Sequence, residues 1–218
     1  DMIEAEELTD AVAIDTPKIT QHWTDIAFSM VPTEDPDLNN ARLDKSVRHA
    51  LHLATNKAHI VDQFYLGLAE EGTTIIPPSN IFWHYRLSEE ERVKVNLDAA
   101  RTMLEASGYR DTDGDGIREC TSDSWVVKEG YEPAGRNLHL EMDVRREHPE
   151  EREIAMYLQD QWRSIGVDLH YNVYDEVTLN VKAYSWCYDA MIRSWSGGID
   201  PNFQLFVLSA RAIDGWSD

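Results

Sequence analysis

Positive charge is scarce in this chain, which has 20 lysines and arginines against 40 aspartates and glutamates and a formal net charge of -20. Such a charge repels nucleic-acid phosphates and anionic lipid headgroups. Long apolar runs are also missing, since no stretch approaches the roughly 20 apolar residues that a membrane-spanning helix needs. The first residues, DMIEAEE, are acidic where a signal peptide would be basic and then apolar. We therefore expect no nucleic-acid partner, no membrane-spanning helix and an acidic solvated surface.

The chain has only two cysteines, and it lacks the common sequence motifs of enzymes. Cys120 and Cys187 are far apart in the sequence, and they could pair in an oxidising compartment, although the sequence does not decide whether they do. We find no Gly-x-Ser-x-Gly nucleophile elbow, no Walker loop, no His-Glu-x-x-His and no Gly-x-Gly-x-x-Gly. The sequence therefore predicts a protein that is not an enzyme and that requires no cofactor.

The chain is long enough for a sizeable core, with 218 residues of which 42% are hydrophobic. Residues 1–22 are polar and weakly patterned, which indicates a linker or the remnant of a preceding domain. Strand patterns follow at 23–31, 138–144, 167–174 and 188–195, and helical patterns at 43–55, 57–66, 97–107, 149–165, 176–184 and 201–208. Ser88 and Glu91 have the spacing of a capping box. This order predicts an α/β fold in which helices flank a sheet.

An acidic turn follows the helix that Asn96 caps and Gly108 ends. Asp111, Asp113 and Asp115 alternate there with glycines, as in the first half of an EF-hand-like calcium loop. Counted from Asp111, the twelfth position of such a loop is Ser122, so Glu119 comes too early and Asp123 one residue late to supply the closing carboxylate. The turn therefore has two interpretations, a structural calcium site or a tight acidic hairpin.

Several ordered motifs give the chain a resemblance to a known family. They are VRHAL at 47–51, ATNK at 54–57, IPP at 76–78, GYRDTDGDGI at 108–117, IGV at 165–167, YD at 188–189 and WSGGIDP at 195–201. In this order they resemble the C-terminal lobe of the extracellular solute-binding proteins of family 5, the dipeptide- and oligopeptide-binding type that serves ABC importers. The likeness covers roughly residues 23–218.

The resemblance implies a fold, a location and partners. The fold would be a lobe like that of type II periplasmic binding proteins, with a mixed β-sheet flanked by helices. The first lobe would precede residue 1, and a further segment would follow residue 218. The protein would be an extracytoplasmic, lipid-anchored monomer that captures a peptide or a related small solute, such as an oligosaccharide, between two lobes and presents it to a membrane permease.

Ligand residues are expected where strands end, because α/β sheets bind their ligands at the carboxyl ends of strands. The first such end carries Arg145 and Glu147. The resemblance implies that Arg145 engages a ligand carboxylate, for which a guanidinium is suited by its paired donors. The alternative is a surface arginine that Glu147 or Glu150 satisfies.

The second strand end is the segment 195–201. Peptide-binding relatives place an aspartate two or three residues after the tryptophan, where it binds the peptide ammonium group, but here those positions are Gly197 and Gly198. Asp200 either takes over this role or caps the next helix. Trp195, Ser196 and the glycines equally suit an uncharged sugar ring stacked on an aromatic face, and core packing is the other interpretation of Trp195.

The sequence thus favours a solute-binding module over two alternatives. One is a calcium-stapled structural or hydrolytic domain, and the other is a ligand-sensing domain of the same fold. If the chain holds half of a binding cleft, it should bind solute weakly or undetectably by itself.

Overall fold

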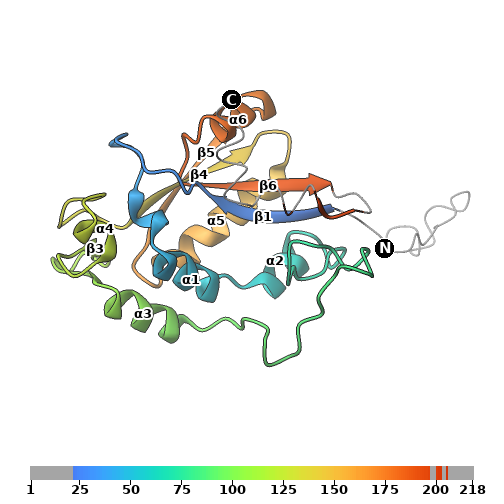
Figure 1. Cartoon of the computed structure of the whole chain (residues 1–218), viewed down its shortest axis with the longest axis horizontal. Coiled ribbons are helices and arrows are strands. Elements are labelled where there is room, and N and C mark those ends of the chain that lie inside the picture. Colours follow the sequence, from blue (N-terminus) through green and yellow to red (C-terminus); the bar gives the residue numbers. More distant parts are fainter. Residues whose placement is uncertain (1–21, 197–199, 203–204, 206–218) are drawn as a thin grey trace, which may run out of the picture.

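A four-stranded mixed sheet lies at the centre of the computed structural model, which describes residues 22–196, 200–202 and 205. Its strands are β1 (His22–Phe28), β4 (His139–Arg145), β5 (Asp168–Tyr174) and β6 (Ala190–Ser196), in the order β1-β6-β4-β5 (Figure 1). β4 is parallel to both of its neighbours, whereas β1 pairs with β6 in the antiparallel direction. The predicted mixed α/β fold is confirmed. Most of the helix predicted at 201–208 lies outside the described residues.

Helices cover both faces of this sheet (Figure 1). Those of seven residues or more are α1 (Lys45–Ala54), α2 (Lys57–Gln63), α3 (Leu97–Ala106), α5 (Pro149–Arg163) and α6 (Glu176–Tyr184). Side chains cap most of them, as when Asn96 accepts a hydrogen bond from the amide of Ala99 at 2.9 Å. α5 instead begins at Pro149, where a missing amide proton costs nothing. None of the helices in the described part of the chain is long and apolar enough to span a membrane.

The core has two parts, one on each face of the sheet, because buried side chains alternate between the faces along the strands. Leu140, Met142 and Val144 of β4 are fully buried in the main cluster, which α1 and α5 complete. On the opposite face Met191 of β6 packs with Leu179 of α6 in a smaller cluster. Successive strand residues point to opposite faces, so each face receives every second side chain.

A hairpin encloses the acidic turn, in agreement with the hairpin interpretation, and a short helix that the sequence did not predict follows it. β2 (Tyr109–Arg110) and β3 (Glu119–Cys120) form an antiparallel hairpin, and α4 (Trp125–Lys128) follows it. Gly108 ends α3 with a φ of +85°, as predicted. Cys120 is buried and Cys187 is exposed, and both are free thiols.

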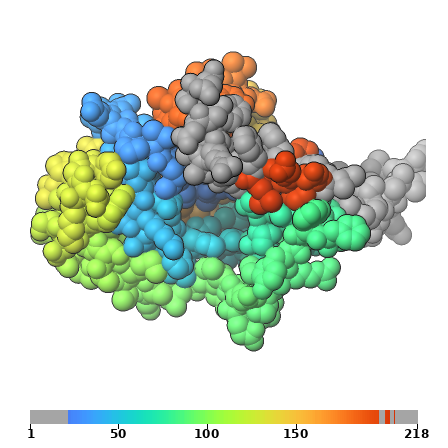
Figure 2. Space-filling model, in the orientation of Figure 1, coloured from blue at the N-terminus to red at the C-terminus, as the bar shows by residue number. Residues whose placement is uncertain are grey.

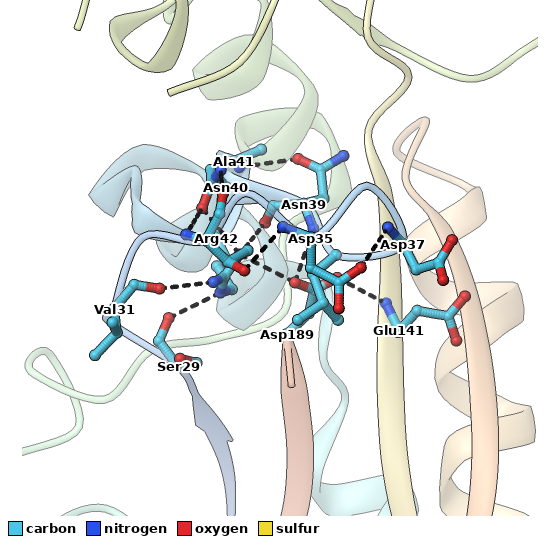
Figure 3. A network of polar contacts seen from close by, with 12 residues as sticks. Ser29, Val31, Asp35, Asp37, Asn39, Asn40, Ala41, Arg42, Glu141 and Asp189 are labelled. Carbon is cyan, nitrogen blue, oxygen red and sulfur yellow. Dashed lines mark hydrogen bonds and ion pairs between the residues drawn. The ribbon is translucent and has the colours of Figure 1, made fainter. Parts of the chain in front are cut away.

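A buried polar network joins the chain before α1 to the sheet (Figure 3). The short 3-10 helix η1 (Asn40–Leu43) carries Arg42, whose Nη1 lies 3.1 Å from Oδ1 of Asp189, and both side chains are fully buried. Asp189 also accepts hydrogen bonds from the amides of Asn39 and Glu141. Burial raises the pKa of Asp189 to about 6, although Arg42 opposes the change. The network fixes η1 against the start of β6 and against β4.

The segment 64–96, between α2 and α3, contains no helix or strand and extends along one side of the molecule (teal to green in Figure 2). We call this segment the arm. Its amides form few regular hydrogen bonds, and it contains the capping-box contacts of Ser88 and Glu91 within a turn rather than a helix. Phe82 is 88% exposed. The other large apolar side chains exposed on the arm are Leu66, Leu68, Ile81, Trp83, Tyr85, Val93 and Val95.

Candidate functional site

The carboxyl ends of β4, β5 and β6 meet at one edge of the sheet, because these strands are parallel. They end at Arg145, Tyr174 and Ser196, and the antiparallel β1 begins beside them. This is the edge at which α/β sheets bind their ligands. The structure therefore places the predicted residues Arg145, Trp195 and Ser196 at this edge.

Arg145 is held by a carboxylate from the first turn of α5. Its Nε donates to Oε1 of Glu151 at 3.0 Å, its Nη2 also contacts this carboxylate, and its main-chain amide donates to Oε2 at 3.0 Å. The Glu151 side chain is only 1% exposed, against 12% for Arg145. Burial opposes the charge of Arg145, but the hydrogen bond to Glu151 raises its pKa above the usual value. The guanidinium is thus charged and fixed in orientation.

Two hydroxyl groups extend this arrangement across the sheet. Nη2 of Arg145 donates to Oγ of Ser194 at 2.8 Å, and Oγ of Ser194 lies 3.1 Å from Oγ1 of Thr24 in β1. Tyr65, after α2, neighbours Thr24, and burial raises the pKa of its hydroxyl. We call Glu151, Arg145, Ser194 and Thr24 the Arg145 row. The sequence did not predict the other three members of this row, because they come together only through the pairing of β1 with β6 and the position of α5.

The two glutamates named in the alternative interpretation of Arg145 form no hydrogen bond or ion pair with it. Glu147 is exposed and forms no hydrogen bond or ion pair with a described residue, and Glu150 pairs with His148 at 2.8 Å. The true partner is Glu151, which the first turn of α5 directs back toward the strand end. Nη1 of Arg145 makes no hydrogen bond to a described residue. Its two N–H donors can therefore bind an anionic ligand.

Trp195 belongs to the other face of the sheet, because it follows Ser194 directly in β6. Its ring stacks on Trp23 of β1, with centroids 6.2 Å apart and planes inclined by 14°, and the guanidinium of Arg193 lies 4.2 Å from its centroid. The structure thus does not bring Trp195 and the Arg145 row together on one face. These contacts favour the packing interpretation of the half-buried Trp195, and its role toward a solute stays a prediction.

The remaining predicted residues of this loop are only partly described. Gly197 and Gly198 lie outside the described residues. Asp200 is exposed, and its Oδ1 accepts a hydrogen bond from the amide of Asn202 at 2.9 Å. Such a contact is typical of a helix cap, so it favours the capping alternative over a ligand role for Asp200.

A second cluster of charge lines a hollow beside α6, with a volume of about 750 Å³. His139 of β4 lies between two carboxylates: its Nδ1 is 2.8 Å from Oδ2 of Asp168 and its Nε2 is 2.9 Å from Oε1 of Glu141. His170 and Lys182 also line this hollow. Burial opposes the charge of His139, but the two carboxylates raise its pKa. The sequence did not predict this cluster, which forms because the pairing of β4 with β5 places His139 opposite Asp168 and Glu141 opposite His170.

The acidic turn forms a compact group of carboxylates. One oxygen from each of Asp111, Asp113, Asp115 and Glu119 lies within 4.8 Å of the others. Glu119 does not stand at the twelfth position of a calcium loop, as the sequence indicated, but β3 folds back along β2 and carries Glu119 to the base of the turn. The hairpin lies at the end of the molecule opposite to the end of β6 (Figure 1).

Comparison with known proteins agrees with this arrangement. Residues 4–213 match the family described as "Bacterial extracellular solute-binding proteins, family 5 Middle". The oligopeptide-binding protein AppA of Bacillus subtilis (strain 168) is 27% identical over 176 residues, which are 79% of this chain and 30% of AppA. The chain therefore spans about a third of the length of this relative.

Solved structures share the fold. The structure of Bacillus subtilis AppA in complex with a nonapeptide matches with a TM-score of 0.69 and 22% identity, over 84% of this chain and 32% of that chain. NikZ from Campylobacter jejuni, in complex with Ni(L-His), matches with a TM-score of 0.65 and 21% identity, over 86% of this chain and 32% of that chain. The architecture is that of a type II periplasmic-binding-protein-like lobe. The chain belongs to the bacterial extracellular solute-binding proteins of family 5.

Proposed function

We propose that this chain is the C-terminal lobe of the substrate-binding component of an ABC importer. The lobe closes on a peptide or a related small solute against a first lobe, and the closed protein presents the solute to a membrane permease. No bond is made or broken. The ligand stabilises the closed state because it contacts both lobes. The whole protein is extracytoplasmic, lipid-anchored and monomeric in this proposal.

The Arg145 row is the observation that carries the proposal. It lies at the carboxyl edge of the sheet in a chain whose family match covers residues 4–213. A buried carboxylate fixes the guanidinium, so little side-chain entropy is lost when a ligand binds. Ser194 and Thr24 add hydroxyl groups beside it.

The relatives favour a solute that carries a carboxylate. AppA was solved with a nonapeptide and NikZ with Ni(L-His), and a free peptide and histidine share this group. A guanidinium recognises carboxylates through its N–H donors, and Nη1 of Arg145 donates to no described residue, whereas Nη2 already donates to Glu151 and Ser194. We propose that Arg145 binds the solute carboxylate through Nη1 while Glu151 holds Nε and Nη2.

The exposed arm supports a position against a second lobe. Phe82 and Trp83 are adjacent and exposed, six further large apolar side chains of the arm are exposed as well, and exposed apolar patches often mark protein interaction sites. Since the chain spans about a third of AppA, we propose that the rest of the longer protein covers this arm.

Native mass spectrometry of the longer protein tests this function. The wild type should retain a carboxylate-bearing solute after purification, and the variant Arg145→Ala should lose it. Arg146→Ala is the matched control, because it removes the same charge from the exposed neighbouring residue. Circular dichroism should first show that all three proteins are folded. Retention of the solute by Arg145→Ala at the wild-type level would refute the role of Arg145, and a protein that retains no solute under any condition would argue against the function.

A further inference from the structure

The acidic turn between β2 and β3 gathers four carboxylates at the far end of the lobe from the Arg145 row. Three of them, Asp111, Asp113 and Asp115, are exposed to solvent, and the fourth, Glu119, is buried. Within the described part of the chain, no lysine, arginine or histidine forms an ion pair with any of the four. The arginines nearest in sequence pair elsewhere: Arg110 with Glu105 and Asp123, and Arg118 with Glu105.

Glu119 provides an independent sign that a cation belongs here. The residue is only 4% exposed. Its Oε2 accepts hydrogen bonds from the amide and the hydroxyl of Thr112, at 2.7 and 2.6 Å. Its Oε1 is buried and has no hydrogen-bond partner among the described residues. A buried, unpaired carboxylate oxygen is costly, so native structures rarely keep one without an ion or a water.

The turn has the residue spacing and the glycine at position 6 that are typical of a calcium loop. Asp111, Asp113 and Asp115 occupy positions 1, 3 and 5 of such a loop, and Gly116 occupies position 6 with a φ of +88°. Glu119 then stands at position 9, which also contributes to the coordination shell of these loops. The expected carboxylate at position 12 is replaced by one that the hairpin folds back.

We propose that Asp111, Asp113, Asp115 and Glu119 bind one calcium ion, which acts as a structural staple of the lobe. Oxygen-only donors on a flexible loop suit Ca²⁺ better than Zn²⁺, which takes nitrogen and sulfur ligands, or Mg²⁺, which demands a rigid octahedron. The ion neutralises the four carboxylates and satisfies Oε1 of Glu119. The ion also stabilises the hairpin, which is joined to the chain before β4 and β5. The amide of Arg118 donates to the carbonyl oxygen of Gly166, and the carbonyl oxygen of Arg118 accepts from the amide of Leu138.

Calcium-dependent thermal unfolding of this 218-residue chain tests the site. Calcium modules of extracellular proteins bind with a Kd of roughly 10⁻⁴ to 10⁻³ M, so 5 mM CaCl₂ should raise the Tm by roughly 2 to 9 °C relative to EGTA at matched ionic strength. Calorimetry should give one site per chain. An equal or larger rise in 5 mM MgCl₂, or no rise in CaCl₂, would overturn the assignment.

Variants distinguish calcium binding at these four carboxylates from a nonspecific effect of calcium on an acidic protein surface. Glu119→Gln and Asp113→Asn should each abolish the calcium-induced rise. In EGTA both should melt no lower than the wild type, because each removes one repelling charge. Asp123→Asn is the matched control: Asp123 pairs with Arg110 and lies outside the group, so the rise should persist. Loss of the rise in Asp123→Asn, or its persistence in Glu119→Gln, would overturn the proposal without touching the solute-binding function.

Discussion

Arg145 at the end of β4 and Glu151 in the first turn of α5 hold each other in place, with Nε of the arginine 3.0 Å from Oε1 of the glutamate. The main-chain amide of Arg145 donates to the second oxygen of the same carboxylate. A single buried side chain therefore sets both the direction of the guanidinium and the exit of the chain from the strand.

Replacing Glu151 alone should destabilise the lobe strongly. The variant Glu151→Met leaves the guanidinium of Arg145, which is 12% exposed, without its counter-charge. Breaking one partner of a buried pair costs about 3 to 5 kcal/mol, whereas replacing both partners by apolar residues is often tolerated. The double variant Arg145→Met, Glu151→Met should thus be more stable than Glu151→Met. Urea unfolding measures both, and a double variant less stable than the single one would show that the pair does not act in this way.

The Arg42–Asp189 pair should be the most sensitive ion pair to disruption in the described part of the chain, since both side chains are fully buried. Arg42→Met should lower the free energy of unfolding by about 3 to 5 kcal/mol, because it leaves the carboxylate of Asp189 buried and unpaired.

Arg92→Met serves as the control for Arg42→Met. Arg92 pairs with Glu89 at 3.3 Å, but both side chains are well exposed, so the loss should be at most about 1 kcal/mol. Equal losses for the two variants in urea unfolding would contradict the importance of burial.

His139 should make stability depend on pH. Its pKa is raised in the folded state by Glu141 and Asp168, against the effect of burial. Its contribution is therefore fully present below about 6.5, the usual unfolded value, and is lost as the pH rises through the folded pKa. We expect His139→Gln to cost about 1 kcal/mol at pH 6, because solvent weakens these partly exposed pairs, and less at pH 9. Urea unfolding at the two pH values checks this, and a cost that does not change with pH would refute it.

Gly108 should tolerate no side chain. A Cβ at this position would lie 2.4 Å from the main-chain nitrogen of Ser124 and 2.7 Å from the carbonyl carbon of Asp123. Gly130 has a similar φ of +77°, but a Cβ there meets nothing within 4 Å. Gly130→Ala should therefore cost only the left-handed strain of about 1 to 2 kcal/mol, and Gly108→Ala distinctly more. The two values of Tm decide the comparison, and similar losses would contradict the steric argument.

Local signals predicted most of the fold. Asn96 and Gly108 bound α3, and Pro149 starts α5, because capping and the missing proline amide act within one turn of the chain. The alternation at 138–144 gave a strand displaced by one residue from β4. The capping box at Ser88 formed its hydrogen bonds without a helix, since two local bonds do not provide an apolar face to bury.

The parts that sequence analysis missed depend on contacts between distant segments. Glu119 joins the acidic group only because β3 pairs with β2. Arg42 meets Asp189 because η1 packs on the sheet, and Arg145 pairs with Glu151, rather than with Glu147 or Glu150, because of the geometry of one helical turn. Spacing along the chain fixes which residues are near in a helix, but it cannot show which strand or helix lies opposite.

The proposal that the solute binds between two lobes is tested most directly by calorimetry. The solute that the longer protein retains is titrated into that protein and, separately, into this 218-residue chain. We expect the isolated chain, which holds one side of the cleft, to bind the solute at least about 100-fold more weakly than the longer protein does. This factor corresponds to about 2.7 kcal/mol in the free energy of binding. Equally tight binding by the isolated chain would contradict the proposal, since the solute would then need no second lobe.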